Sequence, residues 1–237
     1  MSVQYLLGID IGSGACKIPL IDLQGQPVYI AAHEYPTYYP QAGWAEQNPD
    51  DWYQAVCAAL RQMKERGFAV SRIAAIGLSA ATHTAVLMDE DFRVLRPAIL
   101  WTDQRSTPQA ERLERECGNE IFEATYNRVG PVWSLPQLLW VKEHEPEVWN
   151  RVANILFAKD YVRWRPTGTY VTDSIEAVGS MLFDARRGCW SRQLCAPVGL
   201  AVESLPQVVE PGEIVGQVTE PAARTTGLQQ GTPVIAG

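Results

Sequence analysis

The chain of 237 residues lacks any apolar run near the ~20 residues that a membrane-spanning helix requires. Its first residues, MSVQYLLGID, also lack the basic stretch and apolar core of a secretory signal peptide. Lysine and arginine form no cluster, and the net charge of -7 argues against a groove for nucleic acid. We therefore expect a cytoplasmic protein that binds neither membranes nor nucleic acids.

Cysteine is also sparse, and its positions show no metal-ligand spacing. The five residues are an odd number and are scattered along the sequence, at Cys16, Cys57, Cys117, Cys189 and Cys195. This pattern favours reduced thiols that serve as packing residues in a reducing compartment. Hydrophobic residues at 46% and charged residues at 20% are typical of a globular protein, whose length allows one large domain or a domain and a half.

The most informative stretch is LLGIDIGSGACKIPLID, from Leu6 to Asp22. It predicts a strand over Tyr5–Ile11, a tight turn at Gly12-Ser13-Gly14 and a second strand over Cys16–Ile21. Asp10 lies near the end of the first strand between two isoleucines, where a bare carboxylate is costly to desolvate without a cation or donors beside it. A metal bound at Asp10 is therefore one hypothesis.

The glycines around Ser13 support a related hypothesis. They let the backbone approach a ligand closely and turn several N–H groups toward one point, as in loops that cradle phosphate. The stretch lacks the Walker spacing and a following helix, so it is neither a P-loop nor a dinucleotide fingerprint. A Gly-rich hairpin with an Asx-turn at Asp10 explains the same residues without a ligand, and both interpretations stay open here.

The rest of the chain predicts an α/β fold. A third strand over Pro27–Glu34 completes three antiparallel strands, and Pro19 requires the second strand to be at an edge or bulged. Asn48 and Pro49 begin a helix that should run to about Arg66. Strand and helix segments follow, without repeats or low-complexity linkers, which is typical of a mixed sheet with flanking helices.

Two later strands should help to form a ligand site. Ile73–Leu78 and Ala98–Trp101 read as buried strands beside the first, followed by the loops Ser79–Thr82 and Thr102–Arg105. Ligands of open sheets bind at strand ends, so we expect both loops near one site. Further on, Ser134 to Gln137 has the pattern of a capping box at the start of a helix.

Together, these segments resemble the N-terminal half of the FGGY family of carbohydrate kinases, most closely its xylulokinase-like branch. The motifs occur in the family's order over essentially the whole chain, and each is weak alone but strong in combination. They are GIDIG (8–12) with Lys17, GWAEQ (43–47) with Trp52, PAILW (97–101) with Asp103 and Arg105, LPQLLW (135–140), KDY (159–161) with TG (167–168), TD (172–173), LFD (182–184) and GTPVIAG (231–237).

The resemblance implies a ribonuclease-H-like, actin-like ATPase fold, with residues 1–237 as the N-terminal domain that binds sugar and carries a phosphate loop. It implies ATP and Mg²⁺ in a cleft between two such domains. Asp10 would help to hold the Mg²⁺-phosphate end of ATP, as its metal and catalytic residue. Gly12, Ser13 and Gly14 would lie along the phosphates, with Lys17 nearby.

The resemblance also implies a sugar site. Thr82 and His83 match the family's substrate loop, although a half-buried structural histidine is the alternative for His83. Trp44, Asp103 and Arg105 lie in segments near the sugar pocket. For Arg105 a solvated charge at a helix start is nearly as plausible, and Trp101 is expected in the core.

The chain departs from the family pattern at both loops, and these departures leave the sugar open. Gly14 replaces a hydroxyl residue of the first loop, and Ser79-Ala80-Ala81-Thr82-His83-Thr84 replaces the Ser-Gly-Gln-Met-His-Gly of xylulokinases with a loop partly like that of gluconate-type members. The expected function is ATP-dependent phosphorylation of a small sugar, most simply a ketopentose such as xylulose. A gluconate or polyol kinase and a non-catalytic sugar-binding module are the alternatives, whereas the WAEQ and WTDQR segments disfavour another actin-like ATPase.

In the family, the general base lies just beyond a segment that matches Pro233 to Gly237. The resemblance therefore places the base and the C-terminal ATP-binding domain outside these 237 residues. We expect that the chain by itself does not phosphorylate sugar. The partners implied are a small sugar and ATP, with a possible homodimer.

Overall fold

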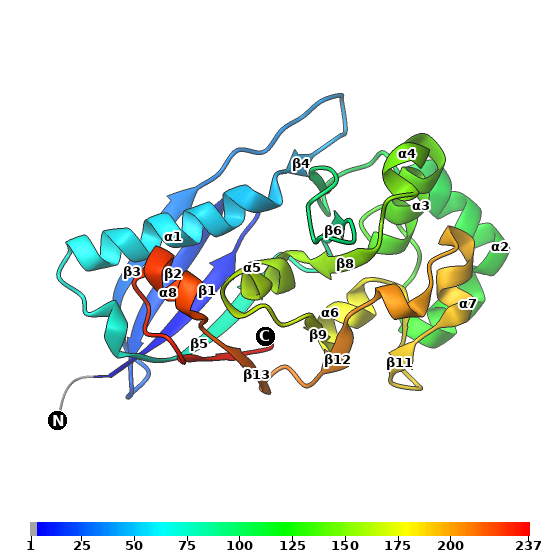
Figure 1. The fold of residues 1–237 in the computed structure, drawn as a ribbon. Helices are drawn as coiled ribbons and strands as arrows, with labels where there is room; N and C mark the ends of the chain where they lie inside the picture. Colours follow the sequence, from blue (N-terminus) through cyan, green and yellow to red (C-terminus); the bar gives the residue numbers. More distant parts are fainter. Residues whose placement is uncertain (1–3) are drawn as a thin grey trace.

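The computed structural model describes residues 4–237, and its largest element is a six-stranded mixed sheet in the order β13-β14-β5-β1-β2-β3 (Figure 1). β1 pairs antiparallel with β2 and parallel with β5, so it lies at the centre of the sheet. The sheet strands are β1 (Tyr5–Ile11), β2 (Ala15–Asp22), β3 (Pro27–Glu34), β5 (Ile73–Ala80), β13 (Ile214–Gln217) and β14 (Pro233–Ile235). The expectation of a mixed α/β fold that begins with three antiparallel strands is confirmed.

Helices α1 (Pro49–Glu65), α5 (Ala158–Thr167) and α8 (Glu220–Thr226) pack together with the sheet in one hydrophobic core. Asn48 caps α1 as expected, because its side chain accepts the amide hydrogen of Asp50. The period of the helix then places Trp52, Leu60 and Met63 in the core. In β1, Leu7, Ile9 and Ile11 are buried in the same core.

A second hydrophobic core lies in the part drawn in green to orange in Figure 1. It contains small two-stranded sheets and several helices, and its apolar residues come from segments between Ala85 and Leu205. The remaining strands and α-helices of residues 4–237 are β4 (Glu46–Gln47), β6 (Ala85–Met88), β7 (Ala98–Ile99), α2 (Thr107–Thr125), α3 (Ser134–His144), α4 (Pro146–Trp149), β8 (Asn154–Phe157), β9 (Val171–Asp173), α6 (Ser174–Gly179), β10 (Phe183–Asp184), β11 (Cys189–Trp190), α7 (Arg192–Cys195) and β12 (Gln207–Val209). No helix within residues 4–237 combines the length and the apolarity that crossing a membrane demands.

Pro19 lies inside β2, which is not an edge strand. The β1–β2 ladder instead lapses at this point, between the pairs Leu7↔Leu20 and Asp10↔Lys17. Gly8 makes room for the proline ring, because a Cβ at Gly8 would lie only 3.0 Å from Pro19 Cγ. The missing donor of Pro19 is therefore accommodated by an irregular ladder in the middle of the sheet.

Two expectations about later elements are wrong. Ala98–Ile99 pairs with β4 and does not lie beside β1, because its partners are Glu46 and Gln47. Ser134 does not cap α3, since the N-cap is Trp133 and the Ser134 hydroxyl donates to the carbonyl of His83. The true partners of both segments lie about 50 residues away in the sequence, and no spacing between residues identifies them.

Candidate functional site

Asp10 lies near the end of β1, on the sheet face opposite to its buried isoleucine neighbours. Across the ladders it stands opposite Lys17 of β2 and Ser79 of β5. Residues opposite one another share a sheet face, so a carboxylate, an ammonium group and a hydroxyl stand on neighbouring strands. Asp10 is partly exposed, and Lys17 and Ser79 are exposed, so the three side chains can meet a ligand.

The loop Gly12–Gly14 is held mainly through its carbonyl groups. Tyr35 donates its hydroxyl hydrogen to the carbonyl of Gly12, and Gln47 Nε2 donates to the carbonyl of Ser13 at 2.7 Å. Within residues 4–237, the amides of Ser13 and Gly14 have no protein acceptor. Both residues are exposed, so these two N–H groups are available to an anion.

Trp101 is part of this loop's surroundings, and the expectation that it belongs to the core is wrong. Its side chain is 43% exposed, and its Nε1 lies 3.2 Å from Ser13 Oγ. Gln47 approaches the same residue from β4, whose strand partner is β7. The segments around β4 and β7 thus reach the site by touching Ser13, although neither joins the large sheet.

The loop from Ala81 to Thr84 follows β5 and lies directly beside the first loop. The amide of Ala81 donates to the carbonyl of Ile11 at 2.9 Å. Thr82 is exposed, whereas His83 is buried and has a left-handed backbone with φ of 53°. The structure therefore brings the expected phosphate loop and the expected sugar loop together at one edge of the sheet.

Burial also sets the chemistry of the His83 imidazole. Removal from water lowers the pKa of His83 to about 4, so the ring is neutral near pH 7. Its Nδ1 is buried without a hydrogen-bond partner among the described residues. A neutral imidazole can exchange hydrogen bonds with hydroxyl groups, but it is a poor proton acceptor at this pKa.

A cavity of about 120 Å³ lies beside this loop and joins several polar residues. Its walls include Ser79, Thr82, Glu176, Lys159 and Asp173. The volume is below the roughly 300 Å³ of a typical ligand pocket. The cavity is therefore large enough for part of a small polar molecule.

Lys159 stands at the centre of a buried charged cluster behind this cavity. Its Nζ lies 2.6 Å from Asp160 Oδ1 and 2.6 Å from Asp173 Oδ2, and Arg163 pairs with Asp160 at 2.9 Å. Lys159 also donates to the carbonyl of Ala236 at 3.3 Å. The cluster therefore ties α5 and the start of α6 to the end of β14.

Sequence reasoning named none of Lys159, Asp173 and Glu176 as site residues. The first two lie in the KDY and TD motifs, which were signals that could have pointed to them. Glu176 gave no signal, because its partner His83 is 93 residues away. Only the fold reveals that contact.

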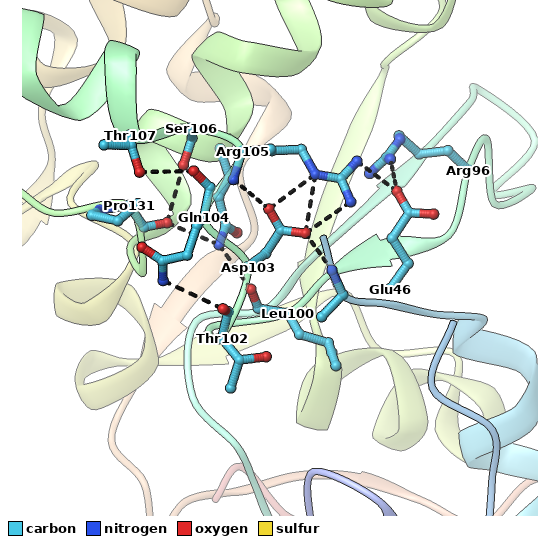
Figure 2. A network of polar contacts seen from close by, with 12 residues as sticks. Glu46, Arg96, Leu100, Thr102, Asp103, Gln104, Arg105, Ser106, Thr107 and Pro131 are labelled. Carbon is cyan, nitrogen blue, oxygen red and sulfur yellow. Dashed lines mark hydrogen bonds and ion pairs between the residues drawn. The ribbon is translucent and has the colours of Figure 1, made fainter. Parts of the chain in front are cut away.

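Asp103 and Arg105 are placed differently from the loops. Both are buried, and Arg105 Nη2 lies 2.8 Å from Asp103 Oδ2 (Figure 2). Arg105 Nη1 also lies 2.6 Å from Glu46 Oε1, and Arg96 approaches the same oxygen at 2.6 Å. The exposed fraction of Asp103 is 0%, and its Oδ2 accepts the amide hydrogen of Ala45 at 2.6 Å.

Trp44 closes this network from one side. The Arg105 guanidinium lies 3.8 Å from the centroid of the Trp44 ring and 5.0 Å from that of Trp140. The alternative of a solvated charge for Arg105 is therefore wrong. Asp103 and Arg105 contact Ala45, Glu46 and Trp44 and thereby fix the Trp44–Gln47 segment. Direct contact of either residue with a sugar stays a prediction.

The described residues contain no group of three or more His, Cys, Asp or Glu side chains arranged to hold a metal ion. Asp10 offers a single carboxylate, with the Ser13 hydroxyl on the adjoining loop. Mg²⁺ in phosphate-transfer sites commonly takes one or two protein carboxylates and completes its shell with phosphate oxygens and water. The residues fit a magnesium ion that arrives with a nucleotide and do not form a cage for a resident metal.

Comparison with known proteins decides the family. The model of the N-terminal domain of the FGGY family of carbohydrate kinases matches residues 5–237. The chain belongs to this family. The FGGY domain is 39% identical to a xylulose kinase of Bacillus subtilis over 236 residues, which are 99% of this chain and 47% of that protein.

Solved structures show the same relationship for this FGGY domain. A xylulose kinase from Rhodospirillum rubrum superposes with a TM-score of 0.94 at 28% identity, over 99% of this chain and 49% of the other. A gluconate kinase from Lactobacillus acidophilus also reaches a TM-score of 0.94, at 25% identity, over 100% of this chain and 48% of the other. The chain spans about half the length of the relatives that it matches.

Proposed function

We propose that this FGGY domain is the sugar-binding and phosphate-loop half of an ATP-dependent kinase whose acceptor is a ketopentose such as xylulose. The observation that carries the proposal is the hydrogen bond between Ala81 and Ile11, which joins the starts of the two loops. A kinase needs its donor phosphate and its acceptor hydroxyl in contact, and these loops are adjacent.

Phosphoryl transfer requires positioning and charge neutralisation more than covalent chemistry by the protein. Asp10 would hold the magnesium ion of the bound nucleotide, which neutralises phosphate charge. The free amides of Ser13 and Gly14 would donate to phosphate oxygens, with the Lys17 ammonium on the same sheet face. The accessibility of these groups near the end of β1 supports the proposed roles.

On the acceptor side, Thr82 and the neutral His83 would exchange hydrogen bonds with sugar hydroxyls. The low pKa of His83 makes it unsuited to take the proton of the reacting hydroxyl near pH 7. This property supports the expectation that the general base comes from another residue, as the family resemblance implies. His83 would then orient the sugar and not deprotonate it.

A coupled assay of ADP formation on the complete product of the gene tests the function. We expect turnover that depends on xylulose and ATP, with weaker turnover on ribulose, gluconate and glycerol. Higher kcat/KM with gluconate would favour the second candidate, which the similarity to the Lactobacillus gluconate kinase supports. Sugar binding without any ADP formation would overturn the kinase proposal in favour of a binding module.

A further inference from the structure

His83 is held in an unfavourable backbone conformation by contacts from several elements. Its φ of 53° lies in the left-handed region, which residues with a side chain rarely adopt. Such conformations are energetically unfavourable and persist only where the surroundings enforce them. The enforcing contacts therefore determine where the imidazole points.

One of these contacts is a carboxylate. Glu176 Oε1, from α6, accepts the amide hydrogen of His83, and Glu176 is 3% exposed. On the other side of the same residue, the Ser134 hydroxyl donates to the His83 carbonyl. Both backbone polar groups of His83 are thus fixed by side chains from distant segments.

The imidazole is confined as well. A Cβ at Gly179, one turn after Glu176 on α6, would lie 3.3 Å from His83 Cδ2, so the ring packs tightly on the helix. The Trp133 ring lies with its centroid 4.7 Å from that of His83. The ring therefore has little freedom to turn while α6 stays in place.

α6 is itself held by the buried charged cluster. The Asp173 side chain accepts the amide hydrogens of Ile175 at 2.9 Å and of Glu176 at 3.0 Å. Asp173 also pairs with Lys159 at 2.6 Å. The position of Glu176 is thus fixed from α5 through Asp173, and a short chain of contacts leads from Lys159 to the His83 amide.

The burial of the Glu176 carboxyl group near Asp160 and Asp173 is energetically unfavourable. Desolvation and the nearby Asp160 raise the pKa of Glu176 to about 8, against the opposing effect of Lys159. Only one Glu176 oxygen has a donor among the described residues, namely the His83 amide. That hydrogen bond is the contact through which Glu176 acts on the loop.

We propose that Glu176 is a positioning residue for sugar binding, which fixes the Ala81–Thr84 loop by accepting the amide hydrogen of His83. This inference rests on the proposed function, because the loop's sugar is part of that proposal. The role requires that the Glu176 side chain be long enough to place an acceptor oxygen at the His83 amide. Its negative charge is not required.

Two substitutions distinguish the length of the Glu176 side chain from its ability to ionise. Glu176→Gln keeps the length and the acceptor oxygen but cannot ionise, whereas Glu176→Asp keeps an ionisable carboxyl group and shortens the side chain by one methylene. In the complete gene product we expect Glu176→Gln to keep the sugar KM within about twofold. We expect Glu176→Asp to raise the sugar KM by about tenfold, as loss of a buried hydrogen bond implies, with the ATP KM unchanged.

Glu143 provides the matched control. This carboxylate accepts from Gln109 at 2.8 Å and pairs with Arg112, away from both loops. Glu143→Asp and Glu143→Gln should leave both KM values unchanged. Circular dichroism and thermal unfolding of every variant show whether its fold is retained.

The opposite pattern would overturn the inference. A wild-type sugar KM in Glu176→Asp, or an increase in Glu176→Gln that exceeds the increase in Glu176→Asp, would show that charge matters and reach does not. An equal rise in the sugar and ATP KM values would point to general damage to the domain. Failure of the proposed function would look different, since the wild-type protein would then form no sugar-dependent ADP.

Discussion

The loops Gly12–Gly14 and Ala81–Thr84 lie beside each other, yet they are held in opposite ways. The first is exposed, with free amides at Ser13 and Gly14. In the second, His83 is buried and fixed on both sides by Glu176 and Ser134. The contrast suggests that phosphate completes the first loop, whereas the second is shaped before its ligand arrives.

The buried network at Asp103 gives the largest expected effect on stability. Asp103→Ala should lower the free energy of unfolding by about 3 kcal/mol, because it leaves Arg105 partly unpaired in the interior. Urea unfolding of this chain measures the change. Asp91→Ala is the control, since its pair with Arg93 is exposed, and a change within about 0.5 kcal/mol is expected. Equal effects for both variants would contradict a structural role for the network.

Asp10→Asn tests the proposed phosphate site at the exposed Gly12–Gly14 loop. We expect kcat of the complete gene product to fall by about 10²–10³-fold, because a group that stabilises charge in the transition state is lost. Asn has nearly the same shape, so the unfolding midpoint should stay close to that of the wild type. Asp22→Asn is the control, because Asp22 only accepts amides within its own turn. Near-normal turnover of Asp10→Asn would remove Asp10 from the phosphate site.

The contact between Glu176 and the buried His83 of the Ala81–Thr84 loop predicts a distinctive dependence of stability on pH. The folded pKa of Glu176 is raised, so its contribution is present at low pH and is lost as the pH rises toward about 8. The folded pKa of His83 is lowered, so its contribution is present above about 6.5 and is lost as the pH falls toward about 4. Between about pH 6.5 and 8, only Glu176 of these two changes stability.

In that range, stability should fall with rising pH by up to about 1.4 kcal/mol per unit, and Glu176→Gln should flatten the slope. Lys159, Asp160 and Asp173 face Glu176 and are present in both proteins, so the difference between the two slopes isolates the ionisation of Glu176. Thermal unfolding of both proteins at half-unit pH steps measures the difference. An identical slope in wild type and variant would mean that Glu176 ionises normally.

The sequence predicted the sheet well because its signals are local. Alternation in β1, the glycines after it and the Asn48 cap each act within a few residues, and each is confirmed. The site was predicted only in part, because its supports are distant. Glu176, Gln47 and Trp101 reach the two loops from segments whose partners cannot be deduced from spacing. Lys159 and Asp173 lie in family motifs, but the sequence analysis did not assign them to the site.

The smallest expected effect tests how loosely the first loop is held. Trp101→Phe removes the donor to Ser13 Oγ, which is a long contact of 3.2 Å in a half-exposed position. The free energy of unfolding should therefore change by about 0.5 kcal/mol or less. The ATP KM should change by about twofold, since bound phosphate would order the loop without this support. Trp190→Phe removes a comparable donor, to the carbonyl of Pro206, far from both loops, and should leave the ATP KM unchanged. A tenfold rise in the ATP KM of Trp101→Phe would mean that the Gly12–Gly14 loop is also ordered before its ligand binds. The contrast with the Ala81–Thr84 loop would then disappear.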